Sequence, residues 1–315
     1  MEKRDIPFIQ FQNIMKSFGK NNVLVGVSLD IPYGERFGII GVSGSGKSTL
    51  LNILIGFIRA DQGAVYYNMR DILREKKEVR RTFGFAAQDG SFYSDLTVME
   101  NLHYFGTLYG MSKVDIEKRA RGLLALVGLT KAMGILGKNL SRGMQKRLDI
   151  ACAMIHEPKV LILDEPTEDL DPILRKDILL LIKKINERGT TIIITSHLLS
   201  EIEVTCTKIA ILHEGKIIET GTPADLKGRY YHNDEVHVET MPGNYEKIVK
   251  KMRKTYVEEV DLQENKMVIR TPNVDGVLHT LFKAVTASKE KIIDIDVRKP
   301  TLEEVFTALT RGKTV

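Results

Sequence analysis

A glycine-rich turn that joins a strand-like segment to a helix-like segment constrains the fold of this chain more than any other feature. Residues 41–49 read Gly-Val-Ser-Gly-Ser-Gly-Lys-Ser-Thr, between an apolar stretch at 36–40 and a stretch with helical apolar spacing at 48–58. The pattern G-x-x-x-x-G-K-[ST] in this strand-to-helix context predicts a phosphate-binding loop (P-loop). Its glycines allow successive backbone N–H groups to face phosphate oxygens, and the helix N-terminus adds a favourable dipole. The nucleotide-binding residues expected here are Gly41, Val42, Ser43, Gly44, Ser45, Gly46, Lys47, Ser48 and Thr49, with Lys47 at the β- and γ-phosphates and the Ser48 hydroxyl at Mg²⁺.

A second turn of similar design opens a basic helix at residues 140–147, which read Leu-Ser-Arg-Gly-Met-Gln-Lys-Arg. A Ser-x-Gly turn at a helix start is also a phosphate-binding device. One ATP needs only one such cradle from one subunit. Two cradles in one chain therefore suggest that each ATP is held between two copies of the chain.

An apolar strand predicted at residues 160–163 ends in two adjacent carboxylates, Asp164 and Glu165. Packing does not require acids at the end of a buried strand, because an unpaired buried charge is costly. Asp164 is therefore a candidate for the Mg²⁺ shell, and Glu165 is a candidate general base for the attacking water. A surface acid pair is the alternative, and the P-loop in the same chain disfavours it.

Length and composition limit the remaining possibilities. With 315 residues, 43% of them hydrophobic and 28% charged, the chain is long enough for one large and one small globular domain. No segment approaches the ~20 apolar residues of a membrane-spanning helix, and residues 1–5 lack a signal-peptide core. The net charge of +5 is too small to indicate nucleic acid as a partner. The two cysteines, Cys152 and Cys206, have no Cys or His at metal-ligand spacing, so buried thiols are expected.

The order of predicted elements favours an α/β fold. Strands are expected at residues 7–14, 23–31, 36–40, 64–68, 82–87, 160–163, 191–195 and 208–212, and the later strands alternate with helical segments. Such alternation indicates a largely parallel sheet covered by helices. Residues 89–157 are rich in leucine, methionine and aromatic residues and predict a helical subdomain. We expect a P-loop NTPase core with an antiparallel β edge, in a domain that covers residues 1–230.

Residues 231–315 predict a small α+β accessory domain. After a polar linker at 229–234, the expected order is strand 235–239, helix 245–254, strand 257–263, strand 266–270, helix 274–287 and strand 291–297. This split β-α-β order is compatible with a ferredoxin-like domain. A last helix is expected at 301–309, with Thr301 and Glu304 forming a capping box.

Together these elements resemble the ATPase subunits of ATP-binding cassette (ABC) transporters over roughly residues 5–225. The resemblance implies that Gln88 is the Q-loop glutamine, which touches Mg²⁺, and that His197 is the switch histidine, which bonds the γ-phosphate and the catalytic water. Phe18 stands where an aromatic ring stacks on adenine, and Asp171 ends the D-loop at the dimer interface. By the same resemblance, two copies enclose two ATP and two Mg²⁺ head to tail. The implied site is Lys47, Glu165 and His197 for catalysis, Ser48, Gln88 and Asp164 for the metal, and Ser141, Gly143 and Asp171 for the nucleotide of the other copy.

Three features depart from the usual family pattern. The signature Leu-Ser-Gly-Gly-Gln reads Leu-Ser-Arg-Gly-Met here, and this form, with Arg142 and Met144, resembles the drug-, lipid- and polysaccharide-exporter branch. Phe18 replaces a more common tyrosine and keeps the stacking face. Asp169 replaces the usual D-loop glycine and adds a charge at the implied dimer interface.

An aromatic segment at residues 92–105 follows Gln88. Most of it is expected in the core of the helical subdomain, but this subdomain is too small to bury all of its aromatic side chains. In the family, the coupling helix of the permease docks here, so we predict a docking surface near Gln88, Phe92, Tyr93 and Leu96. The chain would then lie at the cytoplasmic face of the cell membrane, held there by the permease.

The sequence therefore predicts an ATP-hydrolysing subunit of an ABC transporter of the exporter branch, which acts as a homodimer or heterodimer on a separate permease. A soluble ABC ATPase that acts on ribosomes or DNA is one alternative, but such proteins usually have two cassettes or a long coiled-coil insertion, which these residues do not contain. An ATP-gated regulatory module without turnover is the other, and Glu165 and His197 argue against it. The cargo is not predicted, because the permease selects it.

Overall fold

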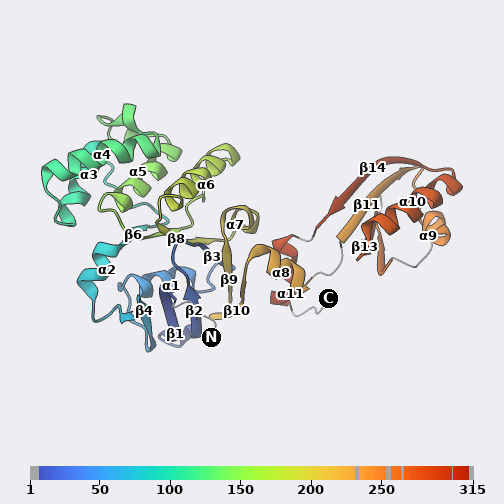
Figure 1. Cartoon of the computed structure of the whole chain (residues 1–315), viewed down its shortest axis with the longest axis horizontal. Helices are drawn as coiled ribbons and strands as arrows, with labels where there is room; N and C mark the ends of the chain where they lie inside the picture. Colours follow the sequence, from blue (N-terminus) through green and yellow to red (C-terminus); the bar gives the residue numbers. More distant parts are fainter. Residues whose placement is uncertain (1–6, 231–233, 253–256, 264–265, 300, 312–315) are drawn as a thin grey trace, which may run out of the picture. The chain divides into compact units, whose positions relative to one another are not determined.

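The computed structural model describes residues 7–230, 234–252, 257–263, 266–299 and 301–311 (Figure 1). Contacts divide the chain into two compact units, Met1–Pro223 and Ala224–Val315. The boundary predicted from the sequence lies after residue 230. The difference corresponds to helix α8 (Pro223–Tyr230), nearly all of which belongs to the second unit.

A six-stranded sheet in the order β10-β9-β3-β8-β7-β6 forms the centre of the first unit. Its strands are β3 (Arg36–Ile40), β6 (Phe83–Ala86), β7 (Val160–Asp164), β8 (Thr191–Ser196), β9 (Lys208–His213) and β10 (Lys216–Gly221). All neighbours are parallel except β10, which is antiparallel to β9. Every residue of β7 and β8 is buried, as the continuous apolar runs of such strands require. The predicted parallel sheet is confirmed.

A four-stranded antiparallel sheet, in the order β2-β1-β4-β5, forms the expected antiparallel part. It consists of β1 (Ile9–Phe18), β2 (Asn21–Ile31), β4 (Gln62–Tyr67) and β5 (Arg70–Asp71). The first predicted strand was too short, because register shifts against β2 let the pairing continue beyond residue 14 to Phe18. Helix α1 (Lys47–Leu54) shares one apolar core with both sheets, in which Phe11, Leu50 and Ile193 are fully buried.

Helices α3 (Val98–Leu108), α4 (Lys113–Val127) and α5 (Arg142–Met154) contact one another and form the predicted helical subdomain, green to yellow-green in Figure 1. Thr97, Ser112 and Ser141 cap these three helices through their hydroxyl groups. Helices α2 (Lys76–Thr82), α6 (Pro172–Asn186) and α7 (Leu199–Thr205) lie outside this subdomain in the sequence. Thr82, which was expected to begin a strand, instead ends α2, and β6 begins at Phe83.

The second unit contains the predicted ferredoxin-like arrangement. Its elements are β11 (Asp234–Met241), α9 (Tyr245–Lys251), β12 (Glu259–Leu262), β13 (Met267–Thr271), α10 (Val274–Ser288) and β14 (Lys291–Arg298). The strands pair antiparallel in the order β12-β13-β11-β14, which is the order that two interleaved β-α-β units produce. This unit has its own apolar core, which includes Val236, Ile248 and Leu281.

The ends of two predicted helices can be compared with the structure. Helix α9 ends at Lys251, and residues 253 and 254 of the predicted helix lie outside the described residues. Helix α11 (Leu302–Arg311) begins with the predicted capping box. The Thr301 N–H donates to Glu304 Oε2 at 2.8 Å, and the Glu304 N–H donates to Thr301 Oγ1 at 3.3 Å.

Candidate nucleotide-binding and catalytic site

The P-loop joins β3 to α1 with backbone conformations that only glycine adopts easily. Gly44 and Gly46 have φ angles of 79° and 107°. A Cβ atom on Gly41 would lie 2.4 Å from the Leu212 carbonyl oxygen, so this position has no room for a side chain. Gly46 is the N-cap of α1, and the partial positive charge of that helix end is therefore directed at the loop.

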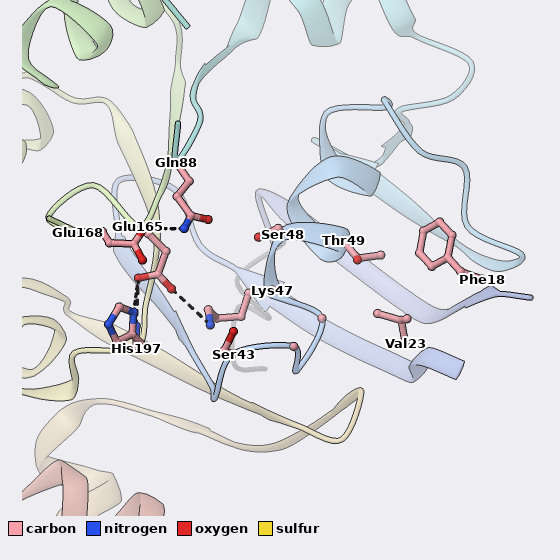
Figure 2. A pocket seen from close by; sticks show the side chains of 12 residues that line it. Phe18, Val23, Ser43, Lys47, Ser48, Thr49, Gln88, Glu165, Glu168 and His197 are labelled. Carbon is pink, nitrogen blue, oxygen red and sulfur yellow. Dashed lines mark hydrogen bonds and ion pairs between the residues drawn. The ribbon is translucent and has the colours of Figure 1, made fainter. Parts of the chain in front are cut away.

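The loop borders a cavity of about 570 Å³, which lies within the range of roughly 300–1,000 Å³ typical of small-molecule sites. Its lining residues are Phe18, Val23, Ser43, Gly44, Gly46, Lys47, Ser48, Thr49, Gln88, Glu165, Glu168 and His197. Figure 2 shows Phe18 and Val23 at one end, and Lys47, Glu165 and His197 at the other. The Phe18 ring is half exposed, with Lys16 Nζ 5.3 Å from its centroid. The cavity thus has an aromatic end and a charged end, whereas Gly41, Val42 and Ser45 shape the loop without lining it.

Lys47 and Glu165 form a buried ion pair at the charged end. Lys47 Nζ lies 3.3 Å from Glu165 Oε1, and it donates to the carbonyl oxygens of Gly41 at 2.8 Å and Val42 at 3.4 Å. The two side chains are only 7% and 9% exposed. Because an isolated buried charge is costly, each charge compensates the other.

His197 contacts the second oxygen of the same carboxylate. Its Nδ1 lies 3.0 Å from Glu165 Oε2, and its backbone N–H donates to that oxygen at 3.2 Å. The Glu165 carboxylate is therefore held between Lys47 and His197, as the dashed lines in Figure 2 show. Glu165 also has a φ of 47°, a strained conformation for a residue with a side chain, of the kind that clusters at functional sites.

Asp164 is held by the neighbouring parallel strand. Asp164 and Thr195 are paired in the β7–β8 register, and the Thr195 hydroxyl donates to Asp164 Oδ1 while it accepts from the Glu165 N–H at 3.1 Å. The carboxyl ends of parallel strands meet at one edge of a sheet, so β3, β7 and β8 bring the loop, both acids and His197 together. Thr195 was not predicted as a site residue, although its place at the end of an apolar strand was a usable signal.

Gln88 is bound to an acid that the sequence analysis also missed. Its Nε2 donates to Glu168 Oε2 at 2.5 Å, and both residues line the cavity. Helix α5 holds the backbone at two points, at Gln88 and three residues later: Lys146 Nζ donates to the Gln88 carbonyl oxygen at 3.3 Å, and the Ser91 N–H donates to Asp149 Oδ1 at 2.6 Å. Glu168 is one of five acids within residues 164–171, and this density could have drawn attention to it.

Asp149 is the most deeply buried acid near the Q-loop. Burial raises its pKa to about 6, although the hydrogen bond from Ser91 and the charge of Lys146 oppose the shift. Its Oδ2 has no hydrogen-bond partner among the described residues. Asp149, Gln88 and Glu168 also line a second cavity of about 270 Å³ between the Q-loop and α5.

The three residues expected to act in trans have structural roles in their own chain, and none of them lines the 570 Å³ cavity. Ser141 Oγ accepts from the Met144 N–H at 3.4 Å and caps α5. Asp171 Oδ1 accepts from two backbone N–H groups at 2.9 and 3.0 Å and caps α6. A Cβ atom on Gly143 would lie 2.8 Å from Leu174 Cδ2, so α5 and α6 pack closely at this point.

Ser48, Gln88 and Asp164 offer oxygen donors that suit Mg²⁺. In Figure 2 the Gln88 amide oxygen lies on the side of Ser48, and its nitrogen faces Glu168. The described part of the chain contains no group of three His, Cys, Asp or Glu residues that could hold a metal ion by itself. Mg²⁺ is usually bound by one or two carboxylates together with substrate phosphates, and this donor set fits that mode.

Comparison with known proteins decides the family. A sequence profile described as "ABC transporter" matches residues 24–168, and one described as "ATP-binding protein DrrA1-3-like, C-terminal domain" matches residues 221–310. The linearmycin resistance ATP-binding protein LnrL of Bacillus subtilis is 34% identical over 310 residues, which are 98% of this chain and 99% of that protein. The chain belongs to the ABC transporter ATP-binding family. A third profile, "AAA domain, putative AbiEii toxin, Type IV TA system", matches residues 138–203 within the same cassette.

Further relatives of this ABC subunit include ATP-binding proteins named for export and for import. Nod factor export ATP-binding protein I of a Rhizobium species is 32% identical over 303 residues, 96% of each chain. The methionine import ATP-binding protein MetN of Clostridioides difficile is 37% identical over 223 residues, 69% of this chain and 70% of that protein. A bacterial ABC transporter cassette solved as a dimer is 30% identical with a TM-score of 0.62, and it covers 68% of this chain and 98% of its own. A dimeric cassette bound to ADP and Pi after hydrolysis is 29% identical, with the same TM-score and coverage.

The family assignment confirms the predicted P-loop NTPase fold, ATP as the nucleotide and ATP hydrolysis as the reaction. ABC ATP-binding subunits form dimers and work with transmembrane partners. Within the described residues of this subunit, none of the helices has both the length and the apolarity needed to cross a bilayer.

Proposed function

We propose that this ABC subunit hydrolyses ATP with Mg²⁺ in sites shared between two copies, and that it drives export through a separate permease at the cytoplasmic face of the cell membrane. The observation that carries the proposal is the Glu165 carboxylate, held between Lys47 and His197 at the charged end of the cavity. LnrL and the Nod factor export protein of Rhizobium, which are named for resistance and for export, match 98% and 96% of this chain. These matches along nearly the whole chain favour export.

The role of each group follows from its position in the cavity. The P-loop N–H groups and Lys47 bind the β- and γ-phosphates, and the Phe18 ring stacks on adenine at the opposite end of the cavity. Glu165 accepts the proton of the attacking water. His197 orients Glu165 through two contacts to Oε2. As the switch histidine implied by the family resemblance, it would also hydrogen-bond the γ-phosphate. Ser48, Gln88 and Asp164 would hold Mg²⁺, which would neutralise phosphate charge.

The second phosphate-binding turn supports a site shared between chains. Ser141 and Asp171 are exposed, so the starts of α5 and α6 are open to a partner while both residues cap their helices. The similar cassettes solved as dimers show that such folds pair. In a head-to-tail dimer, Ser141, Gly143 and Asp171 of one copy complete the nucleotide site of the other. A homodimer and a heterodimer with a related cassette both satisfy this geometry.

Permease docking is proposed at the surface beside the Q-loop, near Gln88, Phe92, Tyr93 and Leu96. Tyr93 is 48% exposed, and its hydroxyl lies 3.1 Å from that of Tyr104, which is also exposed. Phe92 and Leu96 are only partly buried. These side chains present an aromatic surface, with polar groups at its edge, that suits a short amphipathic helix.

A phosphate-release assay on the wild-type chain tests the proposal. Turnover per chain is expected to rise with chain concentration as dimers form, and to stop when EDTA removes Mg²⁺. Turnover that depends on neither concentration nor metal would contradict shared, Mg²⁺-dependent sites. Recovery of the chain from solubilised membranes together with a permease, and loss of that recovery in Tyr93→Ala, would test the docking surface.

A further inference from the structure

We propose that Glu168 is a positioning residue for the metal. Its carboxylate fixes the side-chain amide of Gln88 so that the carbonyl oxygen, and not the NH₂ group, faces the Mg²⁺ position. This inference rests on the Mg²⁺-dependent function proposed above and adds a residue that neither the P-loop nor the acid pair contains.

The two ends of a glutamine amide differ in chemistry. A glutamine side chain presents an oxygen on one side and an NH₂ group on the other, and only the oxygen can bind a hard cation. Rotating the amide by half a turn exchanges the two groups at little steric cost, because they have almost the same size. A glutamine without a fixed partner therefore presents the wrong group to the metal for part of the time.

A carboxylate removes this ambiguity, because an ionised carboxylate accepts hydrogen bonds and cannot donate them. Glu168 Oε2 lies 2.5 Å from Gln88 Nε2, so the NH₂ group must face Glu168. The oxygen is then left on the side of Ser48, as Figure 2 shows. The charge of the acceptor also makes this hydrogen bond stronger than one between neutral groups.

The backbones of both residues are held in place. Helix α5 holds the Q-loop at the Gln88 carbonyl oxygen and at the Ser91 N–H, through Lys146 and Asp149. The Glu168 N–H donates to the Glu165 carbonyl oxygen at 3.2 Å, and the buried Thr167 hydroxyl donates to Glu201. With both backbones held, the hydrogen bond from Gln88 Nε2 to Glu168 Oε2 restrains the Gln88 side-chain torsions, including the orientation of its amide.

The test measures metal affinity in place of turnover. The Glu165→Gln chain is used because it should hydrolyse ATP only slowly. Mn²⁺ replaces Mg²⁺, and its binding to the ATP complex is followed by electron paramagnetic resonance. Glu168→Ala is expected to weaken Mn²⁺ binding by about three- to tenfold, the usual effect of losing one hydrogen bond. Metal-free ATP affinity and the unfolding temperature should not change. The Mn²⁺ affinity of Glu168→Gln should lie between that of the chain with Glu168 and that of Glu168→Ala, because the new amide can either accept a hydrogen bond from Gln88 or donate one to it.

A second background separates orientation from simple charge attraction. In Gln88→Ala, which has no amide to orient, the further change Glu168→Ala should leave Mn²⁺ affinity unaltered. Glu117→Ala, which removes an exposed carboxylate from α4, is the control and should have no effect in either background. Unchanged Mn²⁺ affinity in Glu168→Ala would overturn the role of Glu168 without affecting the proposed function. An equal loss of Mn²⁺ affinity in chains with and without the Gln88 amide would do the same. If the parent chain shows no Mn²⁺-dependent ATP binding, the proposed function fails as well.

Discussion

The two helix-opening turns of the first unit share a design but differ in what surrounds them. The P-loop at residues 41–49 borders a large cavity whose charged side chains contact one another. The turn that opens α5 lies at the surface, where the Ser141 hydroxyl caps its own helix. Ser141 and Gly143, the phosphate-binding groups of this turn, line neither the 570 Å³ nor the 270 Å³ cavity, so they need an external surface to complete a site. The difference between the turns is therefore the structural argument for ATP sites that two chains share.

The largest effect is expected in the cavity beside the P-loop, at Glu165. Glu165→Gln keeps the size of the side chain and removes its ability to take a proton from water. ATP binding should persist, and turnover should fall by about 10²–10⁴-fold, the usual contribution of a general base. Phosphate release and equilibrium ATP binding measure the two effects separately. Near-normal hydrolysis by this variant would contradict the assignment of Glu165.

The glycines of the two turns should differ in their tolerance of a methyl group. In Gly41→Ala the new Cβ meets the backbone oxygen of Leu212, which cannot move aside, so we expect a loss of about 3 kcal/mol in unfolding free energy and of ATP binding. In Gly143→Ala the new Cβ meets only the end of the Leu174 side chain, so the cost should stay below about 1 kcal/mol, with ATP binding retained.

Chemical denaturation and equilibrium ATP binding check this contrast. Equal losses of unfolding free energy and of ATP binding in Gly41→Ala and Gly143→Ala would show that the two turns are equally confined. That result would remove one of the physical differences on which the comparison depends.

Sequence reasoning succeeded where a local pattern carries the chemistry. The P-loop, the strand that ends in Asp164 and Glu165, and the capping box of α11 each depend on residues close together in the chain, and each was predicted. Thr195, Glu168 and Asp149 were missed because their roles arise from contacts with residues 30, 80 and 58 positions away. A strand end and a dense run of acids mark Thr195 and Glu168 as candidates, but no local spacing identifies the partners of these residues. The ferredoxin-like order could be predicted because element order alone limits how the strands can pair.

Asp149 connects helix α5, which the second turn opens, to the Q-loop beside the nucleotide cavity. Its Oδ1 accepts a hydrogen bond from the Ser91 N–H. Burial raises the pKa of this acid from 3.8 to about 6, so the folded chain holds a proton more tightly than the unfolded chain does. The free energy of unfolding therefore falls as the pH rises from about 4 to about 6, because Asp149 loses its proton in the folded chain over this range. Above this range the full cost of the buried charge is present. Between pH 4 and pH 7, the unfolding free energy of Asp149→Asn should rise by about 2 kcal/mol relative to that of the wild type, since one pKa unit corresponds to ~1.4 kcal/mol.

Chemical denaturation of both chains at several pH values measures this difference. Lys146 is the charged group that opposes the shift, so Lys146→Met is expected to enlarge the pH dependence of the wild-type acid. A stability difference between Asp149→Asn and wild type that does not vary with pH would show that Asp149 titrates as an ordinary acid.

The smallest effect is expected in the D-loop. Asp169 has a φ of 58°, a conformation in which glycine avoids the cost that a side chain imposes. Asp169→Gly should therefore stabilise the chain by up to about 1 kcal/mol, because it removes a strained residue from an exposed position. Thermal unfolding measures the change, with Asp169→Ala as the matched control that removes the charge and keeps the Cβ. A lower unfolding temperature in Asp169→Gly would contradict this explanation.

The most direct test of shared sites mixes two inactive chains. Lys47→Ala disables the P-loop half, and Ser141→Arg disables the turn that opens α5, so each variant alone should hydrolyse almost no ATP. In an equal mixture, half of the dimers combine both variants and have one intact site, so activity should appear at no more than about a quarter of the wild-type level. Wild-type activity in Ser141→Arg alone, or a mixture no more active than its components, would contradict the claim that two chains build each site.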